Sequence, residues 1–215
     1  MKVLYEDNHL IAAIKPHMVP SQADSSGSMD MLSTVKEYVK QKYNKPGNVY
    51  IGLVHRLDRP AGGVMVFART SKAAARLSKQ IAENTFEKTY LAVVNGHPDK
   101  SGKFEDYLLK DSSSNTVKIA PKDTPGAKYA ALEYKTLAQT DKLSLMEIRL
   151  ITGRSHQIRV QFASRGFALY GDARYGNAEG DHLALWSRSV CFLHPTTKQK
   201  LCFSAEPDEF PFTMF

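Results

Sequence analysis

The second half of the chain reads as a series of short β-strands, and this feature most narrows the possible folds. From Lys88 onward, β-branched and apolar segments recur at short intervals between polar turns. Alternation is clearest in 143–152, where apolar residues return at about every second position. Strands joined by short turns favour a largely antiparallel sheet. The predicted strands are 89–94, 103–109, 116–119, 129–138, 143–152, 186–193 and 200–205.

The rest of the chain combines two further strands with helices. Apolar strands are predicted at 10–14, which ends at Lys15-Pro16, and at 64–68. No linker or internal repeat is visible. The sequence therefore predicts one α+β domain over 1–215, with a largely antiparallel, mixed β-sheet flanked by helices. Helical spacing predicts a helix over 29–43 with Ser28 as N-cap, a second helix that is capped by Thr70 or Ser71 and runs to about residue 83, and a third over 155–165. The Ser-rich segment 21–28 is predicted to be a mobile flap.

Charge and cysteine content indicate the surroundings of the protein. The net charge is +7 and the isoelectric point is near 9.3. A basic excess suggests nucleic acid as a partner, although many soluble proteins are basic without one. The two cysteines, Cys191 and Cys202, are expected to be buried thiols in a reducing compartment. No signal peptide or membrane-spanning stretch is visible, so we expect a soluble, cytoplasmic protein and, lacking a heptad pattern, a monomer.

One predicted helix carries a row of cations. These side chains recur at spacings of three and four residues, opposite an apolar face. Such a row is able to follow a phosphate backbone, and it is equally typical of a solvated helix face. The row consists of Arg69, Lys72, Arg76 and Lys79.

The segment HRLDRPAGG, residues 55–63, contains the largest number of candidate catalytic groups in a short stretch. Asp58 lies between Arg56 and Arg59, and a nearby positive charge favours the ionised form of a carboxyl group. A Pro and two Gly residues then place it in a turn before a buried strand, where loops commonly present functional groups. An ionised, positioned Asp is what covalent carboxylate catalysis requires.

Two other segments hold candidate groups. Tyr90 lies inside an apolar strand, where a tyrosine is more often structural than functional. The segment 153–160, GRSHQIRV, joins a strand to a helix, so Arg154 and backbone N–H groups are expected to face an anion there. No phosphate-binding Gly loop, metal-binding motif, Ser-hydrolase elbow or complete kinase motif set is present, so no cofactor and no metal are expected.

These motifs, in this order, resemble those of the RluA-type RNA pseudouridine synthases. The resemblance is carried by HRLDRPAGGVMVFAR, EKTYLAVVNG, GRSHQIRVQFASRGFALYGDARYG and the final strands, and it covers nearly the whole chain. It implies the pseudouridine synthase fold without an appended N-terminal RNA-binding domain. It also implies isomerisation of uridine to pseudouridine in a stem-loop of ribosomal or transfer RNA, with no cofactor. Ala61, Ser155 and Gln161 stand where the family commonly has Thr, Thr and His.

The resemblance also implies roles for single residues. Asp58 would be the catalytic carboxylate, attacking either the base or the ribose, and Tyr90 would stack on the target uracil. Arg154 would pair with Asp58, with Arg159 as second choice, and Arg56 would fill the gap left by the flipped nucleotide. The alternatives are an RNA-folding chaperone on the same fold and a structural protein of a ribonucleoprotein particle. The substrate-binding candidates are His55, Arg56, Arg59, Arg159, Arg69, Lys72, Arg76 and Lys79.

Overall fold

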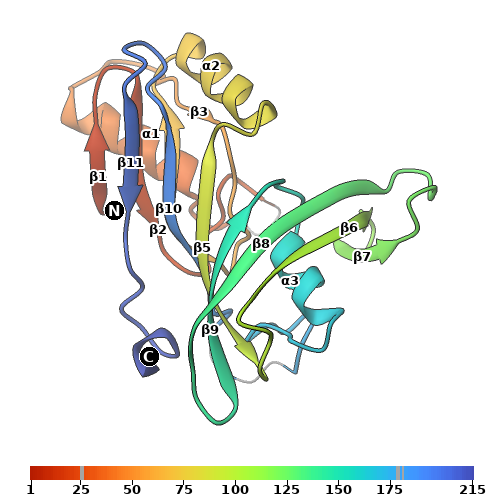
Figure 1. Cartoon of the computed structure of the whole chain (residues 1–215). Helices are drawn as coiled ribbons and strands as arrows, with labels where there is room; N and C mark the ends of the chain where they lie inside the picture. Colours follow the sequence, from red (N-terminus) through yellow and green to blue (C-terminus); the bar gives the residue numbers. More distant parts are fainter. Residues whose placement is uncertain (25–26, 178–179, 181) are drawn as a thin grey trace. The chain divides into compact units, whose positions relative to one another are not determined.

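The chain forms two compact units in the computed structural model, which describes residues 1–24, 27–177, 180 and 182–215. Unit 1 contains Met1–Glu87 and Ser187–Glu206, and unit 2 contains Lys88–Trp186 and Pro207–Phe215 (Figure 1). The predicted α+β class with a mixed, mostly antiparallel sheet is confirmed. No helix among the described residues is long and apolar enough to cross a membrane.

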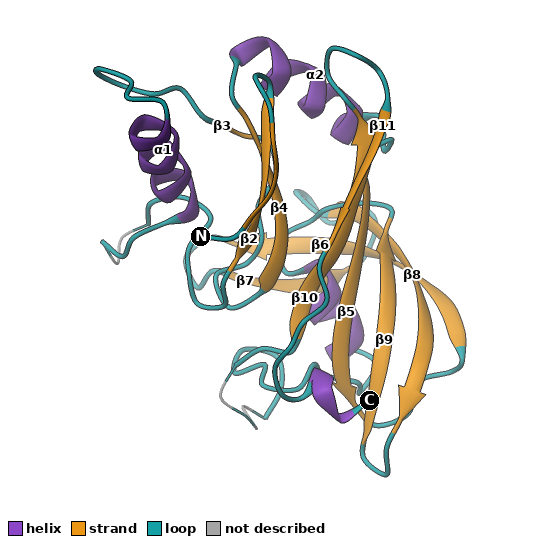
Figure 2. Ribbon diagram, turned by 90° about the vertical axis from the view of Figure 1, so that its left-hand side faces the viewer, coloured by secondary structure: helices purple, strands orange, loops and turns teal. Residues whose placement is uncertain are grey.

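Unit 1 is built on strands that follow the order β1, β2, β4 and β10, with β3 on β4 and β11 on β10. The pairings β1–β2, β2–β4, β3–β4 and β10–β11 are antiparallel. Helices α1 and α2 lie on opposite sides of these strands (Figure 2). The bounds are β1 Val3–Glu6, β2 Leu10–Lys15, α1 Met31–Lys42, β3 Gly52–Leu53, β4 Gly62–Ala68, α2 Ser71–Ala82, β10 Leu185–Leu193 and β11 Lys200–Ser204.

The core of unit 1 explains why β2 and β4 read as continuous apolar runs. Every residue of β4 is buried, because helices cover both faces of these strands. On the α2 side, Leu10, Val64 and Val66 pack with Ala73 and Leu77 of the helix. Sequence patterning located β2 and β4 but missed β1 and β3, which have four and two residues.

Both helices of unit 1 begin at a side-chain cap. The Asp30 carboxylate accepts a hydrogen bond from the Ser33 N–H at 3.0 Å, and the Thr70 hydroxyl accepts one from the Ala73 N–H at 3.1 Å. The prediction of Thr70 is confirmed, whereas the prediction of Ser28 as a cap is wrong by two residues. A carboxylate at position 30 satisfies the N–H of Ser33 and so starts the helix at Met31.

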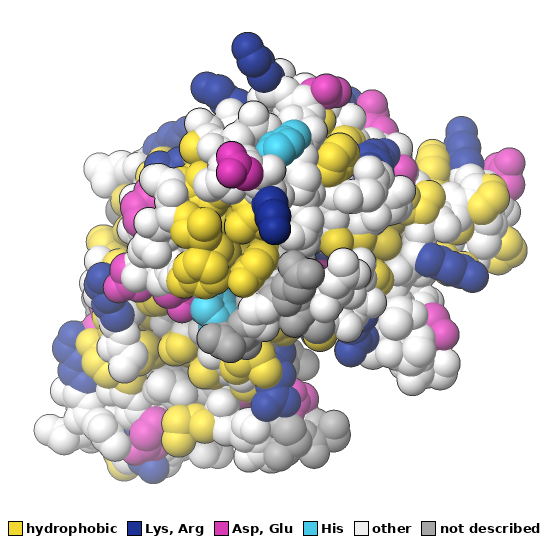
Figure 3. Space-filling view, turned by 90° about the horizontal axis from the view of Figure 1, so that it is seen from below, with side chains coloured by type: hydrophobic (Ala, Val, Ile, Leu, Met, Phe, Trp, Pro, Cys, Tyr) yellow, Lys and Arg dark blue, Asp and Glu magenta, His cyan; other side chains and the backbone are white. Residues whose placement is uncertain are grey.

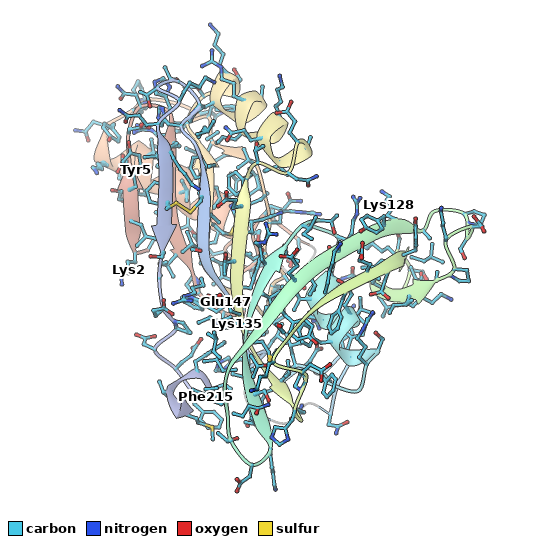
Figure 4. The ribbon with its side chains drawn as sticks, viewed as in Figure 1. Lys2, Tyr5, Lys128, Lys135, Glu147 and Phe215 are labelled. Carbon is cyan, nitrogen blue, oxygen red and sulfur yellow. A yellow bond between two sulfur atoms is a disulfide. The ribbon has the colours of Figure 1, made fainter. Side chains whose placement is uncertain are left out.

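The cysteine prediction is wrong, because Cys191 and Cys202 form a disulfide. The two residues stand directly opposite each other in the β10–β11 pairing, with Cα atoms 4.2 Å apart. Directly opposed residues in an antiparallel pair approach closely enough for a bridge. Cys191 is half-buried and Cys202 is exposed (the yellow bond in Figure 4). The cysteines therefore give no support to a reducing compartment.

Unit 2 is built on five strands in the order β5, β9, β8, β6 and β7, each antiparallel to the next. The third helix, α3, packs on β6 and β7. It is shorter than the predicted 155–165, because His156 has a left-handed backbone with φ of 52°. The bounds are β5 Glu87–Asn95, β6 Ser101–Asp111, β7 Thr116–Ala120, β8 Lys128–Gln139, β9 Leu143–Leu150 and α3 Gln157–Ala163, and a 3-10 turn follows at Phe212–Met214.

Aromatic packing fixes α3 on the sheet of unit 2. The ring of Phe162 meets those of Phe104 and Tyr134 edge-to-face, with centroids 5.0 and 5.5 Å apart. Val160, two residues before Phe162 in the helix, packs in a second apolar cluster with Leu108. The helix therefore has a defined rotation, which determines where its polar residues point.

Candidate active site

Asp58 lies in a tight turn at the start of β4. Its carbonyl oxygen accepts a hydrogen bond from the Ala61 N–H at 3.0 Å, and the residue is half-buried. The glycine pair that follows belongs to the strand and not to the turn. A Cβ atom at Gly63, where φ is +115°, would lie 2.3 Å from the Ser187 carbonyl oxygen. Glycine is therefore required where β4 approaches β10.

Lys15, which the sequence pattern marked only as the end of a strand, holds this turn from inside. Its side chain is fully buried, and Nζ donates to the carbonyl oxygens of Pro16, Arg59 and Ala61 at 2.9, 2.9 and 2.6 Å. Three acceptors match the three donors of an ammonium group. Burial lowers the pKa of Lys15 to about 7, while the charge of Asp58 raises it and that of Arg59 lowers it. Lys15 therefore sets both the shape and the charge of the Asp58 turn.

Replacing Lys15 with Met is expected to lower the free energy of unfolding by about 2–4 kcal/mol, because three carbonyls lose their donor. Urea unfolding followed by circular dichroism measures this change. Lys72→Met, at an exposed position of α2, serves as the control and should stay within about 0.5 kcal/mol of wild type. A Lys15→Met protein with the wild-type midpoint would contradict the assigned role.

Two of the other predicted residues around Asp58, Arg59 and His55, make hydrogen bonds within unit 1. Arg59 donates to the Met18 carbonyl at 3.2 Å and lies 3.5 Å from the Asp24 carboxylate. The Val66 N–H donates to Nε2 of His55 at 2.9 Å, so that side of the ring faces β4. Arg56 is exposed. The flanking arginine Arg59 thus points to the 18–24 segment, and Lys15 is a cation close enough to Asp58 for the two charges to interact.

The predicted flap is anchored at its first residue. Ser21 is buried, and its hydroxyl both donates to the Leu57 carbonyl at 2.8 Å and accepts from the Leu57 N–H at 3.1 Å. These two bonds hold the residue next to Asp58 in place. The prediction of a mobile flap is wrong for Ser21, and residues 25–26 lie outside the described residues.

The cationic row on α2 is not a uniform surface stripe. The Arg69 side chain is 8 % exposed, and Nη1 donates to the Asp7 carbonyl at 2.5 Å and to the Glu6 carboxylate at 3.2 Å. Arg76 donates to the Pro195 carbonyl at 3.0 Å, and Lys79 lies 3.7 Å from Glu83. On the face seen from below in Figure 3, which does not show this row, Lys and Arg side chains are dispersed. The sequence could not show this, because the inward turn of Arg69 depends on contacts with β1.

Loss of charge at Arg69 and at Lys72 is therefore expected to have different effects on stability. Arg69→Met should destabilise unit 1 by about 2 kcal/mol or more, because the buried Glu6 loses one of its partners. Lys72→Gln should stay within about 0.5 kcal/mol of wild type, because this side chain is exposed. Thermal unfolding of the two variants measures the difference. Equal losses of stability in the two variants would contradict the burial of Arg69 against Glu6.

Tyr90 and the 153–160 segment belong to unit 2. Tyr90 is 6 % exposed on β5, opposite Ile148 of β9. Gln157 holds the turn before α3: its Oε1 accepts from the Arg154 N–H at 3.0 Å, and its Nε2 donates to the Ala131 carbonyl at 3.0 Å. The sequence pattern gave no sign of this buried glutamine, which fixes the loop to β8.

Of the two candidate arginines, Arg159 is buried and Arg154 is exposed. Arg159 donates through Nε and Nη2 to both oxygens of the buried Asp172, at 2.8 and 2.7 Å. Arg154 donates from Nε to the Tyr129 carbonyl at 2.9 Å. Because a two-bond pair fixes the plane of a guanidinium, Arg159 is the better-positioned group. The pairing of either arginine with Asp58 stays a prediction.

Asp172, which sequence analysis did not single out, organises the surroundings of Arg159. Burial alone would raise its pKa, but hydrogen bonds and charge from Arg159, with the N–H groups of Arg174 and Tyr175, hold the pKa below its usual range. The Tyr175 hydroxyl contacts Nδ1 of His156 and accepts from the Val117 N–H, both at 2.8 Å. The loop after α3 is thus bonded to both the helix start and β7.

The chain thus holds a hydrogen-bonded aspartate turn and an oriented arginine, in the order of the quoted motifs. Known proteins share this order. The sequence profile described as RNA pseudouridylate synthase matches residues 9–164. The chain belongs to the RNA pseudouridylate synthase family. Enzymes of this family isomerise uridine in RNA to pseudouridine, and the match includes the Asp58 turn, Tyr90 and Arg159.

Curated relatives of this family are similar over most of their length. The chain is 32 % identical to ribosomal large subunit pseudouridine synthase D of Zymomonas mobilis, covering 96 % of this chain and 69 % of the relative. It is 31 % identical to tRNA pseudouridine synthase C of Haemophilus ducreyi, covering 97 % and 92 %. Among solved structures, human RNA pseudouridylate synthase domain containing 4 matches with a TM-score of 0.83 at 19 % identity, covering 99 % and 91 %. This likeness confirms the predicted pseudouridine synthase fold.

Proposed function

We propose that this pseudouridine synthase modifies uridines in structured ribosomal or transfer RNA, with Asp58 as its catalytic carboxylate and no cofactor or metal. The observation that carries the proposal is the Asp58 turn. A fully buried lysine donates to the carbonyls of Arg59 and Ala61 just after a half-buried carboxylate, and the buried Ser21 hydroxyl holds Leu57 just before it. Binding alone does not require a preorganised carboxylate facing a phosphate-rich ligand, whereas covalent catalysis does.

The reaction is an isomerisation that Asp58 starts. The N1–C1′ glycosidic bond breaks, the uracil turns, and C5 forms the new bond to C1′. The proton leaves C5 for water, and N1 takes one up, so atoms balance without a redox partner. Attack by Asp58 on the ribose or on the base leads to the same overall exchange.

The remaining residues bind and orient the substrate in this proposal. Tyr90 offers an aromatic face to the uracil, and such stacking contributes about 1–3 kcal/mol per base. Arg159, held by Asp172, is the arginine that we favour as the partner of Asp58, in place of Arg154. The exposed Arg56 fills the space left by the extruded nucleotide, because chemistry on a base requires flipping it out of its stack.

The whole chain acts as one catalytic domain in this proposal, as a monomer and in the cytoplasm, where its RNA substrates are made. Size-exclusion chromatography with light scattering measures the oligomeric state. Relatives named for ribosomal and for transfer RNA support both substrate classes.

Release of tritium from RNA labelled at uridine C5 tests the proposal. Unmodified total ribosomal RNA and unmodified transfer RNA transcripts are incubated separately with the wild-type protein. Release from either pool supports an active synthase and identifies the substrate class. Binding of both pools without release would support the alternative, an RNA-folding chaperone on the same fold.

A further inference from the structure

Lys88 is a desolvated cation that the mechanism above does not use. It lies on β5 of unit 2, is only partly exposed, and burial lowers its pKa. Its Nζ lies against the backbone of the turn before α3: a Cβ atom at Gly153 would be 3.0 Å away from it. Among the described residues of its unit, no hydrogen-bond acceptor or carboxylate pairs with this ammonium group.

The position of Lys88 relates it directly to Tyr90. Residues two apart on a strand point to the same face and are separated by about 6.6 Å. Tyr90 stands opposite Ile148, and Ile148 stands opposite Tyr134, which packs on Phe162 of α3. Lys88 and Tyr90 therefore share the sheet face that α3 covers.

Among the described residues, two carboxylates that bond to α3 are already engaged. Asp172 is paired with Arg159. Asp106 accepts from Gln161 at 2.6 Å and lies 3.1 Å from Arg165. Removing an ammonium group from water without giving it an acceptor is unfavourable, so the free protein carries an unmet requirement for an anion beside Tyr90.

We propose that Lys88 binds a backbone phosphate of the RNA next to the uridine that stacks on Tyr90. The proposal rests on the proposed function for the identity of the stacked base. A compact ammonium group binds phosphate as a point charge, and RNA supplies a phosphate with every nucleotide. The exposed guanidinium of Arg154, next to Gly153 in sequence, adds positive charge at the same turn. Lys88 is thus assigned to substrate binding and not to bond making.

Kinetics with matched variants test the proposal. Lys88→Gln is compared with Lys88→Arg, which keeps the charge, and with Lys135→Gln. Lys135 is exposed and stands opposite Glu147 on β9, on the other face of the same sheet (Figure 4). On the RNA pool that wild type modifies, Lys88→Gln should raise KM about tenfold with kcat within about twofold. It should also lower the slope of log(kcat/KM) against log[KCl] by about 0.7–0.9, the effect of one lost phosphate contact. Lys88→Arg should restore the slope, and Lys135→Gln should match wild type.

Acetylation footprinting gives a readout that does not depend on turnover. The protein is treated with an N-hydroxysuccinimide ester, with and without saturating bulk transfer RNA, and each lysine is quantified by mass spectrometry. Protection of Lys88 but not of Lys135 supports the contact, even if no tritium is released and the proposed function fails. An unprotected Lys88 in the RNA complex, a protein that binds no RNA, or a salt slope unchanged in Lys88→Gln would overturn it.

Discussion

Asp58→Asn is expected to abolish tritium release, with turnover reduced by about 10³-fold or more, as is typical when a covalent catalytic group is lost. Asparagine has nearly the same shape but no negative charge, so it cannot form the covalent intermediate. The backbone turn should survive, because Lys15 Nζ donates to the carbonyls of Arg59 and Ala61 and the Ala61 N–H donates to the Asp58 carbonyl. None of these bonds uses the Asp58 side chain. Single-turnover release from labelled RNA measures the loss.

Two further measurements separate chemistry from folding. Asp58→Asn should bind RNA at least as well as wild type and unfold at a similar temperature. Asp123→Asn makes the same change in charge at an exposed turn residue and should retain full release. If Asp58→Asn released tritium at the wild-type rate, the catalytic assignment would be wrong even though the family is secure.

The sequence predicted well what depends on local patterning. Apolar, alternating and β-branched runs located β2 and the strands from β4 to β11 to within a few residues, because these patterns are local in the sequence. Thr70 was also predictable as a cap, because its hydroxyl accepts from an N–H only three residues away in the sequence. The motifs that led to the family were also contiguous in the chain.

What the sequence could not predict depends on contacts between distant segments. Nothing local shows that Lys15 reaches the carbonyl of Arg59, 44 residues away, or that Asp172 receives Arg159. The disulfide requires the register of β10 against β11, and Arg69 is buried only because β1 brings Glu6 to it. The part of the site that was missed is thus its supporting charges, whereas the reacting candidates were recognised by motif.

Asp172→Asn should be the most destabilising of these substitutions in unit 2. It removes the carboxylate that accepts two hydrogen bonds from the buried Arg159 guanidinium, and breaking a buried ion pair typically costs about 3–5 kcal/mol. The side chains of the pair are 0 and 6 % exposed, so solvent screens the interaction little. Asp106→Asn is the matched control: its partner Arg165 is 30 % exposed, and a loss of about 1 kcal/mol is expected there. Chemical unfolding of the two variants measures the difference.

The pH dependence of the same variant distinguishes loss of charge from loss of packing. The folded pKa of Asp172 lies below the ordinary value of 3.8. Between these two values the unfolded chain binds more protons than the folded one, so the stabilisation by this carboxylate is complete above about pH 4 and is lost as the pH falls through the folded pKa. The stability gap between wild type and Asp172→Asn should therefore narrow on acidification from pH 5. A gap that stays constant down to the acid transition would show that Asp172 acts through shape, and the orientation of Arg159 would then need another cause.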